Sequence, residues 1–405
     1  MNPHRKIAVT ALLPLLFAVT IFGLFLVSYR YTSHTQGEER FIVYWAGMRS
    51  WLMSGTSPYS DETASYIQAL TVRSGDVNAR VTYPLYGGFI FLPFAAISSY
   101  ALARALWMTL LGVALLMTLL LCLRQTGWRS SVGLLSFFIL SSLLGYPSIH
   151  LLINGNATIL AGLFLVAALE AIRSERDAFA GILLALATIQ PLLVAVVLPF
   201  IIFWLFSQKR WLVLSWLAGL LVFLSVIGIF FIPDWVFQWF RNLLNYSDYM
   251  PPASPSAAFH QWWPGVGRQL GWGFSLIFVV SLLGEWWAAR RRDFRWFLWT
   301  VGLTLVLAQW IGLPSGVENY AAFVLPTAIF AYASEQRGGK KAHWIISLIL
   351  VVLFLGTWGI YFRVSTGQLR SALLFLLPLI MLILLYWVRW WAIRPPRLFV
   401  EEIRE

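Results

Sequence analysis

The chain has 405 residues, of which 60% are hydrophobic and only 11% are charged. Soluble domains carry about 25% charged residues, so this composition excludes a soluble enzyme and indicates a polytopic membrane protein. The formal net charge of +12 would suit nucleic-acid binding, but the basic residues lie in short clusters between apolar runs, as in cytoplasmic loops of membrane proteins. We therefore expect one all-α domain, residues 1–405, with about twelve spans of ~20 residues each.

Apolar runs of spanning or near-spanning length recur along the chain. The first follows Arg5 and Lys6 and lacks a small-residue cleavage site, which indicates an uncleaved anchor rather than a signal peptide. Cys122 is the single cysteine and lies in an apolar run, so neither a disulfide framework nor a thiolate metal site is expected. The runs lie near residues 7–28, 100–123, 131–149, 156–172, 178–190, 192–206, 211–232, 270–289, 295–312, 319–333, 343–362 and 371–391.

A further run, 83–98, contains two prolines and two adjacent glycines, and the distribution of positive charge decides whether it spans. If it does not span, both termini and most of the 29 Lys and Arg residues face the cytoplasm, whereas a span here would reverse that bias. We therefore expect an interfacial juxtamembrane helix, with a short buried span as the alternative. This topology predicts a multi-pass protein of the cell membrane with two large extracytoplasmic loops, 29–99 and 233–269.

A helix is predicted over 41–54, at the start of the first outer loop, because apolar residues recur there with helical spacing. Gly55 ends this helix, and the Ser-Pro-Tyr turn that follows leads into a second helix near 61–70. The first helix is too short to span and is expected to lie in the membrane interface. Its apolar stripe consists of Phe41, Trp45, Met48 and Leu52.

Two carboxylates, Glu38 and Glu39, come immediately before this first helix. The positive end of a helix dipole keeps a carboxylate ionised. Such a group can accept a proton from an attacking hydroxyl that lies within hydrogen-bond reach. An acidic cap on a surface helix, without any catalytic role, is the alternative reading of the pair.

The order of motifs in the chain resembles a known family. Acidic residues precede FIVYWAGMR at 41–49, and GTSPY and YPL follow. This order resembles the membrane glycosyltransferases of the GT-C superfamily, and most closely family 87, the polyprenyl-phosphate-mannose-dependent type. The likeness continues through NGNAT at 154–158, FAGILLALATIQP at 179–191 and ENYAAFVLP at 318–326.

The resemblance implies a GT-C-like fold and a transfer reaction. A hexose, mannose in the type that the chain resembles, would pass with inversion from a polyprenyl-phosphate carrier to a lipid or glycan acceptor on the extracytoplasmic face. The partners implied are this donor, the acceptor and membrane lipids, without nucleic acid. No cofactor is implied, although a divalent cation would find paired oxygen ligands at Glu38 and Glu39 or at Asp61 and Glu62.

Two rival functions remain open at this point. A flippase or transporter for a lipid-linked sugar would carry charges in the middle of its spans, and the predicted spans hold almost none. A catalytically inactive relative that binds lipid is the other rival, because the family's catalytic Asp is replaced here by Arg40. If the chain is active, Glu39 is the first candidate base, followed by Asp61 and Glu38.

The resemblance and the outer-face chemistry also indicate substrate contacts. Gln190 replaces the family's Lys before Pro191, and Arg40 offers a guanidinium fork that fits a phosphate diester. Five histidines lack metal-ligand spacing, so no metal site is predicted. The predicted binding residues are Arg40, Tyr44, Arg49, Tyr83, Arg104, Asn154, Asn156, Gln190, His260, Gln261, Glu318 and Asn319.

Several of these residues have a purely structural alternative. Arg104 is also placed to anchor a helix by snorkelling to the interface. Asn154 and Asn156 precede an apolar run and would cap its helix. His260, beside two tryptophans, would serve as an interfacial anchor, and Glu318 would cap a helix unless it is functional.

Overall fold

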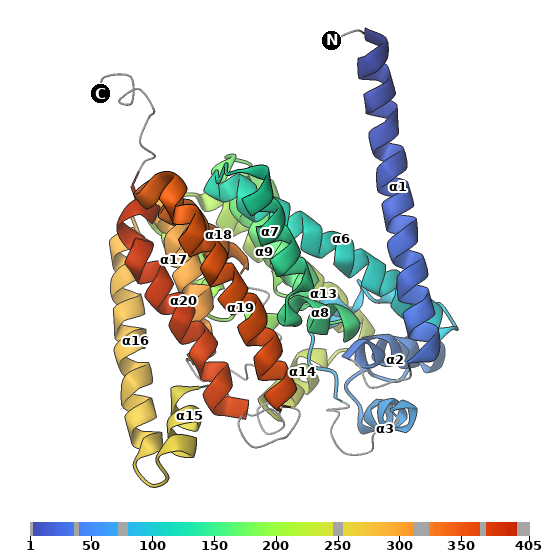
Figure 1. The fold of residues 1–405 in the computed structure, drawn as a ribbon. Coiled ribbons are helices and arrows are strands. Elements are labelled where there is room, and N and C mark those ends of the chain that lie inside the picture. The colour runs from blue at the N-terminus through green and yellow to red at the C-terminus, as the bar shows by residue number, and fades with distance from the viewer. Residues whose placement is uncertain are drawn as a thin grey trace, which may run out of the picture.

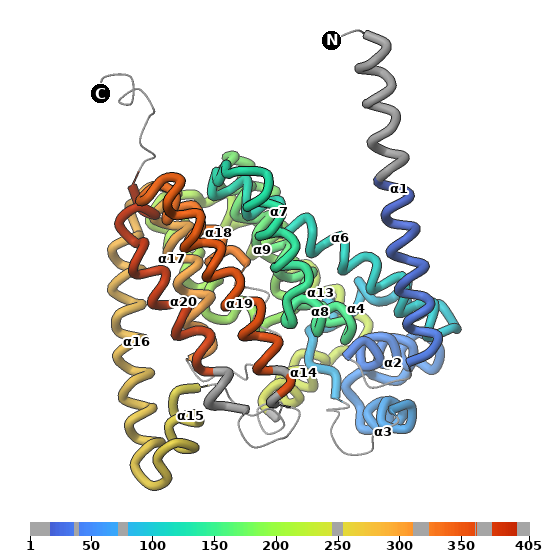
Figure 2. The backbone as a smooth tube through the Cα atoms, viewed as in Figure 1, coloured from blue at the N-terminus to red at the C-terminus, as the bar shows by residue number. Residues whose placement is uncertain are grey.

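The computed structural model describes residues 3–35, 40–71, 80–245, 254–310, 324–364 and 370–394. The described residues fold entirely into helices and connecting turns, so the predicted all-α class is confirmed. Figure 1 shows a bundle with α2, α3, α14 and α15 gathered at one end. Figure 2 shows α15 and α16 on the side of the molecule away from α1.

The first half of the described chain contains twelve helices, two of them single turns in the first loop. They are α1 (Pro3–His34), α2 (Arg40–Ser54), α3 (Asp61–Leu70), α4 (Leu85–Gly88), α5 (Leu92–Ala95), α6 (Tyr100–Thr126), α7 (Val132–Leu144), α8 (Tyr146–Ile153), α9 (Thr158–Arg173), α10 (Asp177–Ala187), α11 (Pro191–Val194) and α12 (Val197–Ser207).

The second half of the described chain continues the bundle with eight α-helices and two short 3-10 helices. They are α13 (Trp211–Phe231), α14 (Trp235–Asn245), α15 (Pro255–Trp262), α16 (Gly267–Ala289), α17 (Phe294–Leu307), η2 (Ala308–Trp310), α18 (Val324–Gly338), η4 (Gly339–Lys341), α19 (Ala342–Val364) and α20 (Arg370–Ala392).

The expected count of about twelve spans is not supported. Among the described residues, five helical segments are long and apolar enough to cross a membrane, or six if the pair α7 and α8, bent by 44°, forms one span. Hydropathy alone does not show where an apolar run breaks. The runs at 178–190 and 192–206, for example, contain the short helices α10 and α12, with the turn before Pro191 and α11 between them.

The basic loops lie together at one end of the bundle. The guanidinium of Arg173 donates to the carbonyl of Arg124 (2.6 Å), and that of Arg210 donates to the carbonyl of Ile172 (2.7 Å). Trp128 donates to Glu335 across the same end. Their gathering agrees with the predicted positive face, while the side of the membrane on which it lies stays a prediction.

The first loop contains the helices predicted for it. Helix α2 ends one residue before Gly55, whose φ of +69° suits a residue without a Cβ. Ser60 caps α3 by accepting a hydrogen bond from the amide of Thr63 (3.1 Å). The predicted stripe is only partly right, because α2 is buried on all sides from Phe41 to Met48, whereas Leu52 is 46% exposed.

The run at 83–98 is not the single juxtamembrane helix that was expected. It forms α4 and α5, which are one turn each and separated by a short turn. The two glycines allow close packing, because a Cβ on Gly88 would lie 2.5 Å from the Met48 sulfur and one on Gly87 would lie 3.4 Å from Ile189. The run therefore packs closely between α2 and the turn before α11.

Candidate functional site

Four segments that are distant in sequence meet beside the start of α2. The amide of Phe41 donates to the carbonyl of Asn154 (3.1 Å), which fixes α2 to the turn between α8 and α9. The indole of Trp107, from α6, donates to the carbonyl of Gly155 in the same turn (2.7 Å). The rings of Phe41 and Trp107 stack with centroids 5.8 Å apart. We call this meeting of α1, α2, α6 and the α8–α9 turn the junction.

Arg104 joins α1 to the junction. Its guanidinium donates to the carbonyl (3.3 Å) and hydroxyl (3.1 Å) of Thr35 and to the carbonyl of Ile153 (3.1 Å). It also lies 5.3 Å from the centroid of the Tyr31 ring. The side chain is 0% exposed, so the snorkelling alternative is wrong.

A second contact brings Gln190 against the first loop. The Gln190 amide nitrogen donates to the Tyr44 hydroxyl (2.9 Å), and the Tyr44 ring stacks on Phe91 with centroids 4.5 Å apart. Tyr86 and Thr188 add a hydroxyl pair at 2.8 Å between the same two segments. The structure thus brings together two predicted binding residues, Gln190 and Tyr44, and holds both by contacts within the protein.

Buried tyrosines reinforce this part of the first loop. The Tyr59 hydroxyl donates to the carbonyl of Tyr83 (3.0 Å). Burial, with a smaller contribution from neighbouring tyrosines, raises the pKa of both Tyr59 and Tyr83 well above its ordinary value. Both hydroxyls therefore stay protonated at neutral pH.

Arg49, on α2, is hydrogen-bonded to the end of α5 and to the residues after it. Its guanidinium donates to the carbonyl of Ala95 (2.8 Å) and lies 5.2 Å from the centroid of the Trp45 ring. The side chain is half-buried, with α2 on one side and the residues after α5 on the other. These contacts hold α2 against the segment that leads into α6.

Among the predicted bases, Asp61 is the one that the structure describes. It begins α3, its side chain is 76% exposed, and it forms an ion pair with Arg80 (2.7 Å). Arg80 also contacts the side-chain oxygen of Asn242 on α14 (3.5 Å). The ion pair engages one of the two carboxylate oxygens of Asp61, Oδ1.

The two asparagines of the NGN turn have different surroundings. The Asn156 side-chain oxygen accepts from the amide (3.0 Å) and hydroxyl (2.8 Å) of Thr158 as α9 begins, which is the structural role considered for it. Asn154 is half-buried, and its side-chain nitrogen lies 2.9 Å from the Nε2 atom of His150. Asn154 is therefore the more accessible polar side chain of this turn.

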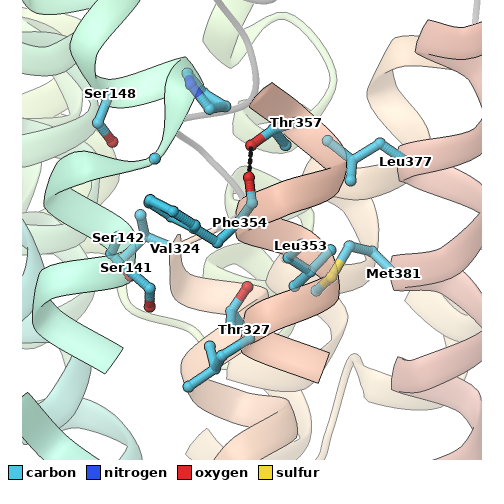
Figure 3. A pocket seen from close by; sticks show the side chains of 13 residues that line it. Ser141, Ser142, Ser148, Val324, Thr327, Leu353, Phe354, Thr357, Leu377 and Met381 are labelled. Atoms are coloured by element: carbon cyan, nitrogen blue, oxygen red, sulfur yellow. Dashed lines mark hydrogen bonds between the residues drawn. The ribbon is translucent and has the colours of Figure 1, made fainter. Parts of the chain in front are cut away.

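Helix α8, which precedes this turn, also lines an apolar cavity of about 80 Å³. Figure 3 shows it between α7–α8 and the helices α18, α19 and α20. Two of its hydroxyls are bonded within the protein, since Thr357 donates to the carbonyl of Phe354 (3.0 Å) and Ser141 to that of Phe138 (3.1 Å). Most of the other lining residues are aliphatic or aromatic, among them Leu350, Leu353 and Leu377, and such a lining suits a hydrocarbon occupant.

The remaining predicted residues lie elsewhere or outside the described chain. His260 and Gln261 are exposed on α15, which packs on α16 and α20 rather than on the junction. Arg40 is half-buried as the first residue of α2. Glu38, Glu39, Glu318 and Asn319 lie outside the described residues. No three His, Cys, Asp or Glu side chains among the described residues are grouped to hold a metal ion.

Sequence reasoning missed Trp107 and Gly155. Gly155 has φ +62°, and a Cβ there would lie 2.7 Å from the Phe41 Cβ. The Asn-Gly pair signals a turn with positive φ, but nothing in the sequence shows that α2 and α6 both pack against it.

The described chain is all helical and contains several helices that are long and apolar enough to cross a membrane. These features define an all-α integral membrane protein. The chain belongs to glycosyltransferase family 87, whose family model matches residues 82–314, more than half of the chain. It is therefore a membrane glycosyltransferase, and the resemblance noted in the sequence is confirmed. The chain has no match among curated proteins. The family match includes Arg104 and the α8–α9 turn but begins after the acidic residues of the first loop.

Proposed function

We propose that the protein transfers a hexose from a polyprenyl-phosphate sugar to an acceptor hydroxyl at the junction, on the extracytoplasmic side of the membrane. The main support is α8, which lines the apolar cavity with Pro147 and Ser148 and is followed directly by the half-buried Asn154. A donor with a hydrocarbon chain and a sugar-phosphate head needs an apolar and a polar site side by side. Mannose is the first sugar to test.

In the proposed reaction, the acceptor oxygen attacks the anomeric carbon of the donor from the face opposite the phosphate. The new glycosidic bond forms as the bond to the phosphate oxygen breaks, so the configuration inverts and polyprenyl phosphate leaves. Glu39 takes the acceptor's proton as general base. Arg40, the next residue along the chain, stabilises the negative charge on the leaving phosphate.

Alternative bases remain within the proposal. Asp61, whose exposed carboxylate pairs with Arg80 through one oxygen, is the second candidate, and Glu38 is the third. Asn154 is proposed to bind sugar hydroxyls, because an amide offers both a donor and an acceptor. Gln190 is proposed to support the site through Tyr44.

The test is transfer of radiolabelled hexose from polyprenyl-phosphate donors into lipid-extractable product by the purified protein. We would compare the wild type with Glu39→Gln, Asp61→Asn and Glu38→Gln, and use Glu62→Gln as the control on an exposed neighbouring carboxylate. General-base loss is expected to lower kcat by about 10²–10⁴-fold in one variant, with Glu62→Gln unchanged.

Three results would contradict the proposal. Transfer from nucleotide sugars but not from polyprenyl-phosphate sugars would overturn the donor class. Movement of intact lipid-linked sugar across vesicles without transfer would favour a flippase. Binding of the donor without either activity, in the wild type, would favour an inactive relative.

A further inference from the structure

Helix α14 has one face turned to the protein and one apolar face turned outward. Val236, Phe237 and Phe240 are 39%, 82% and 52% exposed. Because an α-helix turns by about 100° per residue, these three side chains lie within about a third of its circumference. The buried Asn242 lies on the opposite side of the helix. A short helix with this division of polar and apolar residues is typical of the membrane interface.

The inward face of α14 is bonded to the first loop. The Ser57 hydroxyl donates to the side-chain oxygen of Gln238 (2.7 Å). The indole of Trp239 donates to the carbonyl of Thr82 (2.8 Å). Figure 1 shows α14 at the same end of the bundle as α2 and α3. The helix therefore supports two separate parts of the first loop.

The angle between α13 and α14 is fixed by close packing. The indole of Trp235, in the first turn of α14, donates to the carbonyl of Ser225 on α13 (3.3 Å). A Cβ on Gly228 would lie 2.6 Å from the Trp235 indole nitrogen, so the glycine makes room for this ring. The outward face of α14 is therefore held in one orientation relative to α13.

The surroundings of this face indicate lipid as its occupant. Helix α13 is long and apolar enough to cross a membrane, and Val222, Phe223 and Phe230 are among its exposed apolar residues. This exposed apolar surface runs to the end of α13 and resumes on α14 after the turn at 232–234. Arg241, exposed next to Phe240, places a cation at the edge of the apolar face, where it suits the phosphates of lipid headgroups.

We propose that α14 is an interfacial helix that docks on the lipid surface at the junction end of the bundle. Phe237 and Phe240 insert at the boundary between headgroups and acyl chains, and Arg241 lies among the phosphates. Because the other face of α14 is bonded at Ser57 and Thr82, the membrane supports the first loop through this helix. The inference concerns the lipid contact of the protein and does not depend on the sugar donor.

The first test measures the depth of nitroxide spin labels on the full-length protein in vesicles of phosphatidylcholine and phosphatidylglycerol. The labels are attached to Phe237→Cys and Phe240→Cys in a Cys122→Ala background, since Cys122 is the single cysteine. Val222→Cys, exposed on α13, is the hydrocarbon reference, and Glu62→Cys, exposed on α3, is the water reference.

The labels at 237 and 240 should lie about 5–10 Å below the lipid phosphates. Their collisions with oxygen should exceed those of the label at 62, and their collisions with a water-soluble nickel complex should be fewer. Accessibility equal to that at 62 would mean that this face meets water. Dipolar broadening would mean a second copy on the face, and exclusion of both reagents would mean a protein partner. Each of these three results overturns the inference, and a single labelled variant that folds is enough to decide.

The second test addresses the support of the first loop. Asn242→Leu removes the hydrogen bond from the Asn242 side-chain amide to the carbonyl of Val81 (3.2 Å). Gln208→Leu is the matched control, because the Gln208 amide donates to the carbonyl of Arg292 (3.1 Å) at the other end of the bundle. Amide exchange is measured over residues 80–83.

Exchange over 80–83 should rise about tenfold in Asn242→Leu, the effect of losing one such hydrogen bond, and should stay unchanged in Gln208→Leu. If Asn242→Leu does not fold, Trp239→Phe replaces it, because that variant loses the bond to Thr82. Equal exchange in the α14 variant and the control would show that α14 does not support this segment.

Discussion

The amide nitrogen of Gln190 donates a 2.9 Å hydrogen bond to the hydroxyl of Tyr44, which is 146 positions earlier in the chain. The contact ties the turn before α11 to the buried half of α2, beside the stacked rings of Tyr44 and Phe91. The Gln190 side chain thus supplies a hydrogen-bond donor without a charge. The pair is therefore a direct link between the family-matched region and the first loop.

We predict that Gln190 and Tyr44 are energetically coupled. A double-mutant cycle with Gln190→Leu and Tyr44→Phe, followed by unfolding in detergent, should give a coupling free energy of about 0.5–1.5 kcal/mol, the usual net value of such a hydrogen bond. If the losses in free energy of unfolding of the two single variants add up to that of the double variant, the contact does not form in the folded protein.

Gly155→Ala should strongly destabilise the protein. The backbone has φ +62° there, and the new Cβ would lie 2.7 Å from the Phe41 Cβ and 3.2 Å from Trp107. Strain and overpacking together should lower the free energy of unfolding by about 2 kcal/mol or more, which a lower thermal midpoint would report. Gly162→Ala, on α9 with nothing within 4 Å of the new Cβ, is the control and should be neutral or stabilising; equal behaviour of the two variants would contradict the turn geometry.

Glu335→Ala should loosen the end of the bundle opposite the junction. The Glu335 carboxylate accepts from the Trp128 indole and the Ser130 hydroxyl (3.0 Å), and the His343 ring nitrogen lies 2.8 Å away. Removing it leaves half-buried donors unpaired, at a cost of about 1–3 kcal/mol. Thermal unfolding measures the loss, with Glu62→Ala on exposed α3 as the control; a midpoint as high as the control's would mean that this cluster contributes nothing.

Filling the apolar cavity should discriminate between donors by chain length. Leu353→Trp places a large ring in the cavity of about 80 Å³, and should raise the KM for a long-chain polyprenyl-phosphate hexose about tenfold by displacing apolar contacts. A donor with two isoprene units should be unaffected. Leu355→Trp, exposed on the same helix, is the control, and an equal KM rise for both donors would exclude the cavity as a chain site.

Local features of this protein were predictable from its sequence. Helices α2 and α3, the stop at Gly55 and the turn made by Asn156 depend on short-range signals, namely helical spacing, glycine and asparagine chemistry. The number of spans was not predictable, because hydropathy does not reveal the turn before α11 or the bend between α7 and α8.

The candidate site was predictable only in part. The family motifs indicated Asn154, Gln190 and Tyr44, and the structure places two of them in direct contact. The burial of Arg104 depends on Thr35 and Ile153, which lie 69 and 49 positions away. Contacts of this separation arise from packing and leave no periodic signal in the sequence.

Helix α8 is only eight residues long and leaves α7 at an angle of 44°. Its first turn borders the apolar cavity, and the carbonyl of Asn154, the residue that follows it, accepts the hydrogen bond that Phe41 donates at the start of α2. A helix this short moves as one body, so a displacement of Pro147 is also a displacement of Asn154. The apolar and the polar parts of a substrate would thus contact the same helix, and a shift of α8 that changes the fit of one part would also change the fit of the other.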